Sequence, residues 1–274
     1  MKVSVILVNY NSAALLRQCL KSIYEQTKGI SFGIIVVDNA SSDNSRQIVR
    51  SEFPHVHLIE SSVNLGFSRG NNLGASLAKG MYLLFLNTDT ILFENSIKLL
   101  ADFLDKYPEV GAVGPKILFD DRYFQLSAGR LPNLFGEFID KIVYSLARKW
   151  RAVMCPLLER RFNKIKAVGW LTGACFMVRQ KAFLQVSGFD EKIFMYFEDK
   201  DLCKRLNSSG WQVMYYPSTS IIHLLAGSSG NVDKQKINEF YRTSQLYYYR
   251  KHLGRLQSEM IRLYLRATGK LRCL

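Results

Sequence analysis

The sequence predicts an α/β protein with a mostly parallel, doubly wound central sheet. Apolar, strand-like runs alternate with helical segments through the first half of the chain, and each run ends in a short polar loop. Residues 81–90 (MYLLFLNTDT) show this best, because residues 82–86 lack polar alternation and should be buried on both faces, as in a central parallel strand. Such sheets bind ligands beyond the carboxyl ends of their strands, so we expect the functional site among these loops.

The first half of the chain should contain strand–helix units in regular succession. Runs of apolar, often β-branched residues predict strands at residues 3–8, 33–37, 56–59 and 82–86. Helices are expected from the cap residue Ser12 to about Gln26, from the loop after the second strand to about Arg50, up to Lys79 with Gly80 as the stop, and over residues 96–105.

The second half is less regular. Strands are expected at residues 110–119, 123–127 and 219–224, with a strand–turn–strand unit over 167–179 and an aromatic strand at 193–197. Helices are expected over residues 134–155, where Pro156 would end the helix, from Glu198 onward, and over residues 234–267 as one or two basic, tyrosine-rich helices.

Length and composition limit the class of protein. The 274 residues suffice for one large α/β domain or two small ones, and a hydrophobic content of 48% indicates a sizeable core. The five cysteines are scattered without CxxC spacing, which favours reduced thiols in a cytosolic setting over a disulfide framework or a zinc site. The N-terminal residues do not resemble a signal peptide, and no apolar run approaches the ~20 residues that a membrane span needs.

The net charge of +14 is concentrated in two segments. Residues 140–166 hold 8 basic and 2 acidic residues, and residues 234–274 hold 10 and 2, so these segments account for the whole excess. A charge distribution of this kind predicts a polyanionic partner, either anionic lipid or nucleic acid.

Residues 134–155 combine this charge with an apolar stripe. One side of the expected helix carries Phe135, Phe138, Ile139, Ile142, Leu146, Trp150 and Val153, and the other carries Glu137, Lys141, Tyr144, Arg148 and Arg151. A basic amphipathic helix fits a membrane interface, and the pattern alone fits a helix packed on the protein body equally well. The localised charge favours the membrane.

Two phosphate-binding motifs are absent from the sequence. The turn after the first strand reads NYNS instead of GxGxxG, which disfavours a nicotinamide or flavin enzyme, and there is no GxxxxGK[ST] motif. Gly66, Gly70 and Gly74 recur at a spacing of four. Ligand contact explains this spacing about as well as loop flexibility and close helix–strand packing do.

Polar residues follow two of the predicted strands. Asp38 comes after the second strand and could accept a hydrogen bond from a base N–H or a ribose hydroxyl. Asn87, Thr88 and Asp89 follow the strand at residues 82–86, where their oxygens could hold Mg²⁺ or Mn²⁺ and, through it, a diphosphate. The same residue types also form ordinary turns and helix caps.

Taken together, four stretches resemble the nucleotide-sugar half of family 2 glycosyltransferases. They are VSVILVNYNS, VVDNASSD, NLGFSRGNNLG and LFLNTDT, in that order, and they are most similar to the branch with bacterial rhamnosyltransferases and other cell-surface polysaccharide enzymes. The resemblance covers residues 3–225 and implies a single, Rossmann-like glycosyltransferase A domain. Its expected bounds are 1–230, made of a nucleotide-sugar half at 1–127, a basic amphipathic insertion at 128–166 and an acceptor and catalytic half at 167–230, followed by a helical extension at 231–274.

The resemblance also implies a donor site. Asp38 would bind the nucleobase, and Asp89 with His223 would hold the metal at the position of the family's DXD motif, whose first aspartate is Asn87 here. A lone histidine is otherwise more often structural. The residues expected to contact the nucleotide sugar are Asn9, Asn11, Asp38, Asn39, Gly66, Arg69, Asn72, Asn87 and Thr88.

The stretch FEDKD implies the catalytic residues. It resembles the family's ED motif, which makes Asp199 the catalytic base and Glu198 a residue that orients acceptor or base, with Asp201 as a structural cap. Acidic residues at a helix start are also ordinary, because the helix dipole stabilises them. The acceptor residues implied by the resemblance are Trp170, Thr172 and Gly173.

The expected function is therefore an inverting, metal-dependent glycosyltransferase in cell-surface glycan synthesis. The donor would be a dTDP- or UDP-sugar, with rhamnose as the sugar that the branch suggests, and the acceptor a lipid-linked glycan or polysaccharide. The enzyme would be cytoplasmic and peripheral on the inner face of the cell membrane, without a nucleic-acid partner. The alternatives are a sugar nucleotidyltransferase, a basic nucleic-acid-binding protein and a non-catalytic glycan-binding relative.

Overall fold

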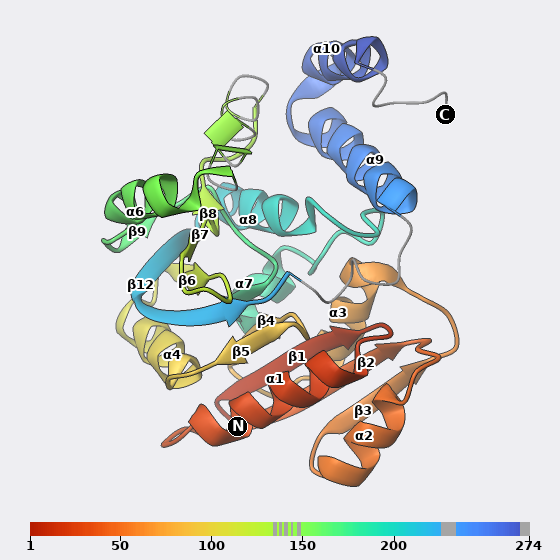
Figure 1. Ribbon diagram of the computed structural model, residues 1–274, viewed down its shortest axis with the longest axis vertical. Helices are drawn as coiled ribbons and strands as arrows, with labels where there is room; N and C mark the ends of the chain where they lie inside the picture. The colour runs from red at the N-terminus through yellow and green to blue at the C-terminus, as the bar shows by residue number, and fades with distance from the viewer. Residues whose placement is uncertain are drawn as a thin grey trace.

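The computed structural model describes residues 1–133, 136, 139, 142–143, 145–146, 149–225 and 234–268. These residues form a ten-stranded sheet with helices on both sides, which confirms the predicted α/β class (Figure 1). The strand order is β3 (His57–Ser61), β2 (Phe32–Asn39), β1 (Val3–Asn9), β4 (Tyr82–Leu86), β11 (Cys175–Arg179), β6 (Val110–Leu118), β12 (Gln212–His223) and β5 (Thr90–Leu92).

The sheet is parallel in its first half and mixed in its second. Strands β3, β2, β1 and β4 run parallel, whereas β11 runs antiparallel to both β4 and β6, and β12 is parallel to β6. The short strands β7 (Phe124–Gln125) and β9 (Lys166–Ala167) pair with β6 and β12, respectively. A separate ribbon joins β8 (Ala128–Gly129) to β10 (Trp170–Leu171).

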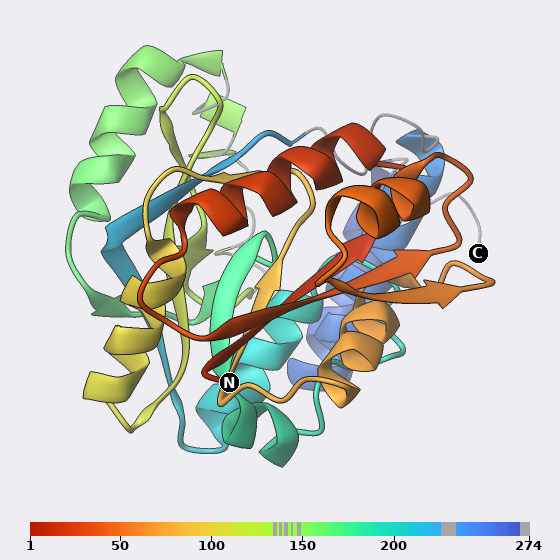
Figure 2. The same ribbon diagram turned by 90° about the horizontal axis from the view of Figure 1, so that it is seen from below.

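Helices cover both faces of the sheet, as Figures 1 and 2 show. One face is covered by α1 (Ala13–Gln26), α2 (Ser45–Glu52) and α4 (Ser96–Lys106), and the other by α3 (Gly66–Ser76), α7 (Gln180–Gln185) and α8 (Glu198–Ser208). Each face of the sheet has its own apolar core. In β1, Val5 and Leu7 belong to the core under α1, α2 and α4, and Ile6 belongs to the core under α3, α7 and α8. An apolar run without alternation is therefore what this three-layer arrangement requires.

Three further helices lie outside these layers. Helix α6 (Arg151–Arg161) packs near β7, while α9 (Lys234–His252) and α10 (Gly254–Ala267) pack on each other. A separate apolar cluster joins them to the chain just before α8, through Phe197, Tyr248 and Tyr249. None of the helices among the described residues is both long and apolar enough to cross a membrane.

The closely spaced glycines serve packing. A Cβ atom at Gly74 would lie 2.6 Å from Ile6 Cγ2, and one at Gly70 would lie 2.9 Å from Val8 Cγ1, so α3 sits directly against β1. Gly66 has a φ of +76°, and a Cβ atom there would lie 2.6 Å from Phe194. Close contact of the helix backbone with side chains of β1, and of Gly66 with Phe194, therefore explains why these three positions have no side chain.

Several predicted elements are wrong in extent or type. Helix α3 ends at Ser76 instead of Lys79, and β12 begins at Gln212, well before residue 219. Pro156 was expected to end a helix, but it lies inside α6, which begins at Arg151 and continues past the proline. A proline this close to the start of a helix removes one hydrogen bond of the second turn, and the helix continues to Arg161.

The aromatic segment at residues 193–197 is not a strand. Tyr196 and Phe197 have positive φ values of 66° and 67°, which no strand can contain. The side chains pack on α9 instead of the sheet: the ring of Phe194 stacks on Phe240 at 4.5 Å, and that of Phe197 lies 5.5 Å from Tyr248. The aromatic composition therefore reflects contact with a late helix.

The predicted helix at residues 134–155 is described only in part. Gly136, Ile139, Ile142 and Leu146 are helical, and the side chains of Ile139, Ile142 and Leu146 are exposed. The other stripe residues before Lys149 lie outside the described residues.

Candidate active site

The predicted strand-end site lies at one edge of the sheet. Asn9 ends β1 and is paired in register with Asp38 of β2, and Asp89 follows β4, the other neighbour of β1. All three side chains are buried. The sheet topology thus brings together residues that are far apart in the sequence.

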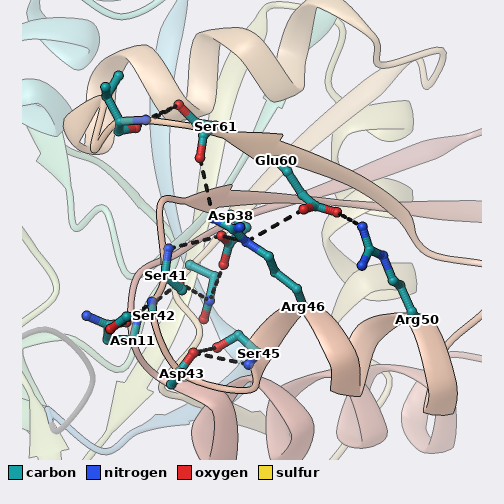
Figure 3. A network of polar contacts seen from close by, with 12 residues as sticks. Asn11, Asp38, Ser41, Ser42, Asp43, Ser45, Arg46, Arg50, Glu60 and Ser61 are labelled. Carbon is teal, nitrogen blue, oxygen red and sulfur yellow. Dashed lines mark hydrogen bonds and ion pairs between the residues drawn. The ribbon is translucent and has the colours of Figure 1, made fainter.

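Asp38 is the centre of a hydrogen-bond network after β2 (Figure 3). Its Oδ1 accepts from Ser41 N at 3.0 Å and from Arg46 Nε at 2.6 Å, and its Oδ2 accepts from Asn9 Nδ2 at 3.1 Å. Burial alone would raise the pKa of Asp38, but the hydrogen bonds from Ser41, Arg46 and Asn9 outweigh it and hold the pKa below its usual value. Sequence reasoning found Asp38 and missed Arg46, which is eight residues further along and has no motif around it.

Asn11 joins the first loop to the second. Its backbone φ is 49°, its N–H donates to Ser41 Oγ at 3.0 Å, and its Oδ1 accepts from Ser42 N at 2.7 Å. Ser12 occupies the predicted N-cap position of α1, but its hydroxyl does not cap the helix. It donates instead to Asn9 Oδ1 at 2.8 Å and lies 3.1 Å from Thr88 Oγ1, so it links the loop after β1 to the loop after β4.

Gly66, Arg69 and Asn72, which were predicted to contact the nucleotide sugar, lie on α3, and Asn39 at the end of β2 contacts the start of this helix. Asn39 donates to the carbonyl of Gly66 at 3.0 Å, which ties the end of β2 to this helix. Asn72 donates to the carbonyl of Phe189 at 2.9 Å and accepts from its N–H at 2.9 Å, and exposed Arg69 lies 3.6 Å from a carboxylate oxygen of Glu191. Asn72 and Arg69 therefore face the segment before α8, apart from the Asp38 network.

Asp89 and His223 lie next to each other, as the metal prediction requires. His223 Nε2 is 3.3 Å from Asp89 Oδ1, and the pairing of β12 with β5 sets His223 opposite Thr90. The other ring nitrogen, Nδ1, is 3.3 Å from Gln125 Oε1. In the tautomer that donates Nδ1–H to Gln125, the Nε2 lone pair faces a carboxylate oxygen, which is a suitable donor set for a divalent cation.

Asp89 and His223 stand as a pair rather than as part of a larger cluster. Within the described part of the chain, no group of three His, Cys, Asp or Glu side chains could hold a metal ion. The metal prediction therefore continues to rest on Asp89 and His223. Gln125, which orients His223, had no signal in the sequence, because an isolated glutamine in a short strand resembles any other polar residue.

The start of α8 holds two adjacent carboxylates, of which Glu198 is buried and Asp199 is half-buried. Asp199 Oδ2 accepts from Gly173 N at 3.0 Å, and Asp199 Oδ1 accepts from Lys200 N at 2.7 Å. Glu198 is 6% exposed, and among the described residues its Oε2 has no hydrogen-bond partner. Burial and the charge of Asp199 raise the pKa of Glu198 to about 8, and burial also raises the pKa of Asp199.

Of the three predicted acceptor residues, Gly173 contacts these carboxylates, Trp170 lies near Lys200, and the N–H of Thr172 donates to the carbonyl of Ser127 at 2.8 Å. Gly173 bonds to Asp199, and its Cβ position is 3.5 Å from Glu198 Oε1. The Trp170 ring is half-buried, 5.2 Å from Lys200 Nζ. Ala174, the residue after Gly173, connects the start of α8 to the loop after β4, because its carbonyl accepts from Asn87 N at 2.9 Å.

Asp201 is structural, but it is not a helix cap. It is fully buried and accepts from Arg205 Nε at 2.7 Å, from Lys251 Nζ at 2.6 Å and from His252 Nε2 at 2.7 Å. Burial alone would raise its pKa, but His252, Arg205 and Lys251 lower it to about 2. Lys251 and His252 belong to α9, so the C-terminal helices are attached directly to the helix that carries the predicted base.

A three-layer α/β domain with a polar cluster at its strand ends and a pair of carboxylates at the start of α8 is the arrangement of a glycosyltransferase A enzyme. Residues 4–186 match the family model described as "Glycosyl transferase family 2". The chain therefore belongs to glycosyl transferase family 2 and is a glycosyltransferase, as the sequence motifs predicted.

Curated relatives agree with this assignment. The chain is 29% identical over 261 residues to N-acetylglucosaminyl-diphospho-decaprenol L-rhamnosyltransferase of Mycobacterium tuberculosis, covering 91% of this chain and 85% of that protein. It is 26% identical to rhamnosyltransferase WbbL of Escherichia coli, covering 81% of this chain and 83% of the relative.

Solved structures confirm the fold. The mannosyltransferase PcManGT from Pyrobaculum calidifontis, in complex with GDP-Man and Mn²⁺, matches 92% of this chain with a TM-score of 0.64 and 18% identity. TarS from S. aureus (residues 1–349), in complex with UDP, matches 91% with a TM-score of 0.58 and 18% identity. The present chain spans 64% and 66% of these two proteins.

Proposed function

We propose that this glycosyltransferase moves rhamnose from a nucleoside-diphosphate sugar to a lipid-linked glycan, with inversion at the anomeric carbon and with a divalent cation. The choice of rhamnose and of a lipid-linked acceptor is supported by the relatives, two of which are named as rhamnosyltransferases. A sugar diphosphate and a cation are supported by the pairing of Asp89 with His223, and a base for direct displacement by the carboxylates at the start of α8.

The observation that carries the proposal is a short hydrogen-bonded path across the site. Asn87, in the loop that contains Asp89, donates to the carbonyl of Ala174, and the N–H of the neighbouring Gly173 donates to Asp199. A donor diphosphate near Asp89 and an acceptor hydroxyl near Asp199 would therefore meet across residues 173–174. This proximity is what a direct displacement between two bound substrates needs.

Asp199 is the proposed base. The pKa of Glu198 is raised to about 8, so Glu198 stays neutral near pH 7 and leaves the negative charge of the pair on Asp199. Ionised Asp199 takes the proton of the acceptor hydroxyl while that oxygen bonds to the anomeric carbon. The bond from this carbon to the diphosphate oxygen breaks, its electron pair leaves with the diphosphate, and attack from the opposite face inverts the centre.

The donor site is proposed around the strand ends. The nucleoside, as a dTDP or UDP group, would lie near Asn9, Asn11, Asp38 and Asn39, and the sugar diphosphate near Gly66, Arg69, Asn72, Asn87 and Thr88. Asp89 and His223 would hold Mg²⁺ or Mn²⁺, which when bound offsets the charge that develops on the leaving diphosphate. Trp170, Thr172 and Gly173 would contact the acceptor.

The enzyme is proposed to work in the cytoplasm, as a peripheral protein on the inner face of the cell membrane. This location suits a lipid-linked acceptor and a nucleotide donor, and the two basic segments suit an anionic leaflet. The exposed side chains of Ile139, Ile142, Leu146 and Trp150 support membrane contact by the segment at 134–155.

Calorimetric titration tests the donor site. We would titrate dTDP, UDP and GDP with and without Mn²⁺ into the wild type, Asp89→Ala and the control Asp102→Ala, whose carboxylate is exposed on α4. The proposal expects one nucleotide to bind in a metal-dependent way, with binding lost in Asp89→Ala and kept in Asp102→Ala. Absence of binding to all three nucleotides in the presence of Mn²⁺ would refute the donor site.

A further inference from the structure

Helix α10 carries apolar residues on two opposite sides. Its inner side, with Ser258, Ile261 and Leu265, is buried in the cluster that contains Tyr248 and Tyr249. Its outer side exposes Leu256 (76%), Met260 (52%), Leu263 (63%) and Tyr264 (40%). A helix that simply covers a protein has a polar outer side, so the exposed side of α10 is suited to contact with something else.

The charge around this apolar side is positive. Arg255 and Arg266 are exposed on α10, and Arg262 lies 3.5 Å from Glu259, the one acidic residue of the helix. The wider segment at residues 234–274 carries 10 basic and 2 acidic residues. Apolar side chains framed by arginine are the composition of helices that lie in the interface of anionic membranes.

A second exposed apolar group occurs in the other basic segment. Trp150, Val153, Leu157 and Ile165 are each between 46% and 59% exposed, on or next to α6. Figure 1 shows α6 and α10 both in the upper half of the molecule, whereas β2, β3 and α2 lie in the lower half. The two segments that hold the excess positive charge, residues 140–166 and 234–274, thus each carry a group of exposed apolar side chains.

We propose that the outer side of α10 is a membrane-docking surface that binds anionic bilayers. This extends the proposed function, which places both basic segments at the membrane, by naming the surface of α10 that enters it, and it rests on that function only for the lipid-linked acceptor. A second copy of the chain is a poorer occupant, because a symmetric contact would bring the same arginines together. An anionic leaflet supplies both the apolar layer and the opposite charge.

Vesicle co-sedimentation of the full chain tests the proposal. We would compare vesicles of phosphatidylcholine alone with mixed phosphatidylglycerol and phosphatidylcholine, using Leu256→Ser/Leu263→Ser, Arg255→Ser/Arg266→Ser and the control Leu184→Ser. Leu184 is a matched control because it is 66% exposed on α7, outside both basic segments.

The wild type is expected to bind the anionic vesicles and not the neutral ones, with affinity that falls as salt rises. The leucine double variant should bind about 10- to 100-fold more weakly, because apolar groups no longer enter the interface. The arginine double variant should bind about 25-fold more weakly. Leu184→Ser should bind like the wild type, and circular dichroism should show all variants folded.

Three results would overturn the proposal. The first is equal binding of neutral and anionic vesicles, and the second is equal binding by the wild type and the leucine double variant. The third is a wild-type dimer in light scattering that the leucine double variant loses, which would make a second copy the occupant. Nucleotide titration without vesicles on the same samples separates these results from a failure of the proposed donor site.

Discussion

The loop after β2 and the start of α8 both concentrate acidic residues, yet their electrostatics are opposite. In the first region, the carboxylate of Asp38 is buried but surrounded by donors, and its pKa is lowered. In the second region, Glu198 is also buried, but its Oε2 has no hydrogen-bond partner among the described residues, and its pKa is raised to about 8. The hydrogen bonds that each buried carboxylate receives therefore decide whether its pKa falls or rises.

The α8 region contains both kinds of carboxylate in four residues. Asp201, two positions after Asp199, accepts hydrogen bonds from three basic side chains and has a pKa of about 2. The comparison therefore predicts that substitutions of neighbouring acidic residues in α8 have different effects. Three substitutions in α8 and one at Asp38 test this.

The largest effect should come from Asp199→Asn. Removal of the base should lower kcat by about 10²- to 10⁴-fold while nucleotide binding is unchanged, since Asp199 has no role at the strand ends. Rates of sugar transfer and calorimetric titration measure the two quantities. A kcat close to that of the wild type would remove Asp199 from the mechanism and would turn attention to Glu198.

Asp201→Asn should mainly affect stability. It leaves Arg205, Lys251 and His252 without their buried counter-charge, so the free energy of unfolding should fall by about 3–5 kcal/mol. Since the folded pKa of about 2 lies below the ordinary 3.8, the carboxylate stabilises the fold above that range. The difference from the wild type should disappear as pH falls through about 2. Urea unfolding measures it, and Asp102→Asn, an exposed ion pair with Lys98, should change stability by about 0.5 kcal/mol or less.

Glu198→Gln should show the opposite pH dependence. The folded pKa of about 8 exceeds the ordinary 4.5, so the wild type loses stability as pH rises through this interval, by up to about 1.4 kcal/mol per pH unit. Glutamine does not ionise, so the variant should become progressively more stable than the wild type as pH rises. Urea unfolding at several pH values across this interval checks the trend, and parallel pH curves would contradict the raised pKa.

Asp38→Asn should have the smallest effect of the four. It keeps the side-chain shape but weakens the bonds from Arg46 and Ser41, and the expected loss is about 1–3 kcal/mol. Thermal unfolding with and without the bound nucleotide separates this loss from a change in affinity. A variant as stable as the wild type would show that the hydrogen bonds of Asp38 do not contribute to the stability of the fold.

Local patterns in the sequence predicted most of the fold. Strands such as residues 82–86 were recognisable because burial on both faces requires a continuous apolar run, and the polar residues after them mark where parallel strands end. His223 could be placed beside Asp89 only through the resemblance, since their proximity depends on the pairing of β12 with β5. The same holds for the position of Asp199.

Contacts between distant segments could not be predicted. The aromatic residues at 193–197 suggested a strand because composition does not reveal that their partners are in α9. The pairs of Asp201 with Lys251 and His252 span 50 and 51 residues and involve residue types that are usually exposed. Ser12 looked like a helix cap, and only the meeting of the loops after β1 and β4 gives its hydroxyl other partners.

The attachment of α9 to Asp201 has a consequence for biosynthesis. At about 5–20 residues per second, a ribosome adds Lys251 roughly 2.5–10 s after Asp201, given the 50 residues between them. During this interval the nascent α8 holds a carboxylate whose final partners have not been synthesised, beside the pair that would perform the transfer. If Asp199 is the base, as proposed, α8 would reach its final contacts only late in translation, after the strands of the first half of the sheet have been synthesised.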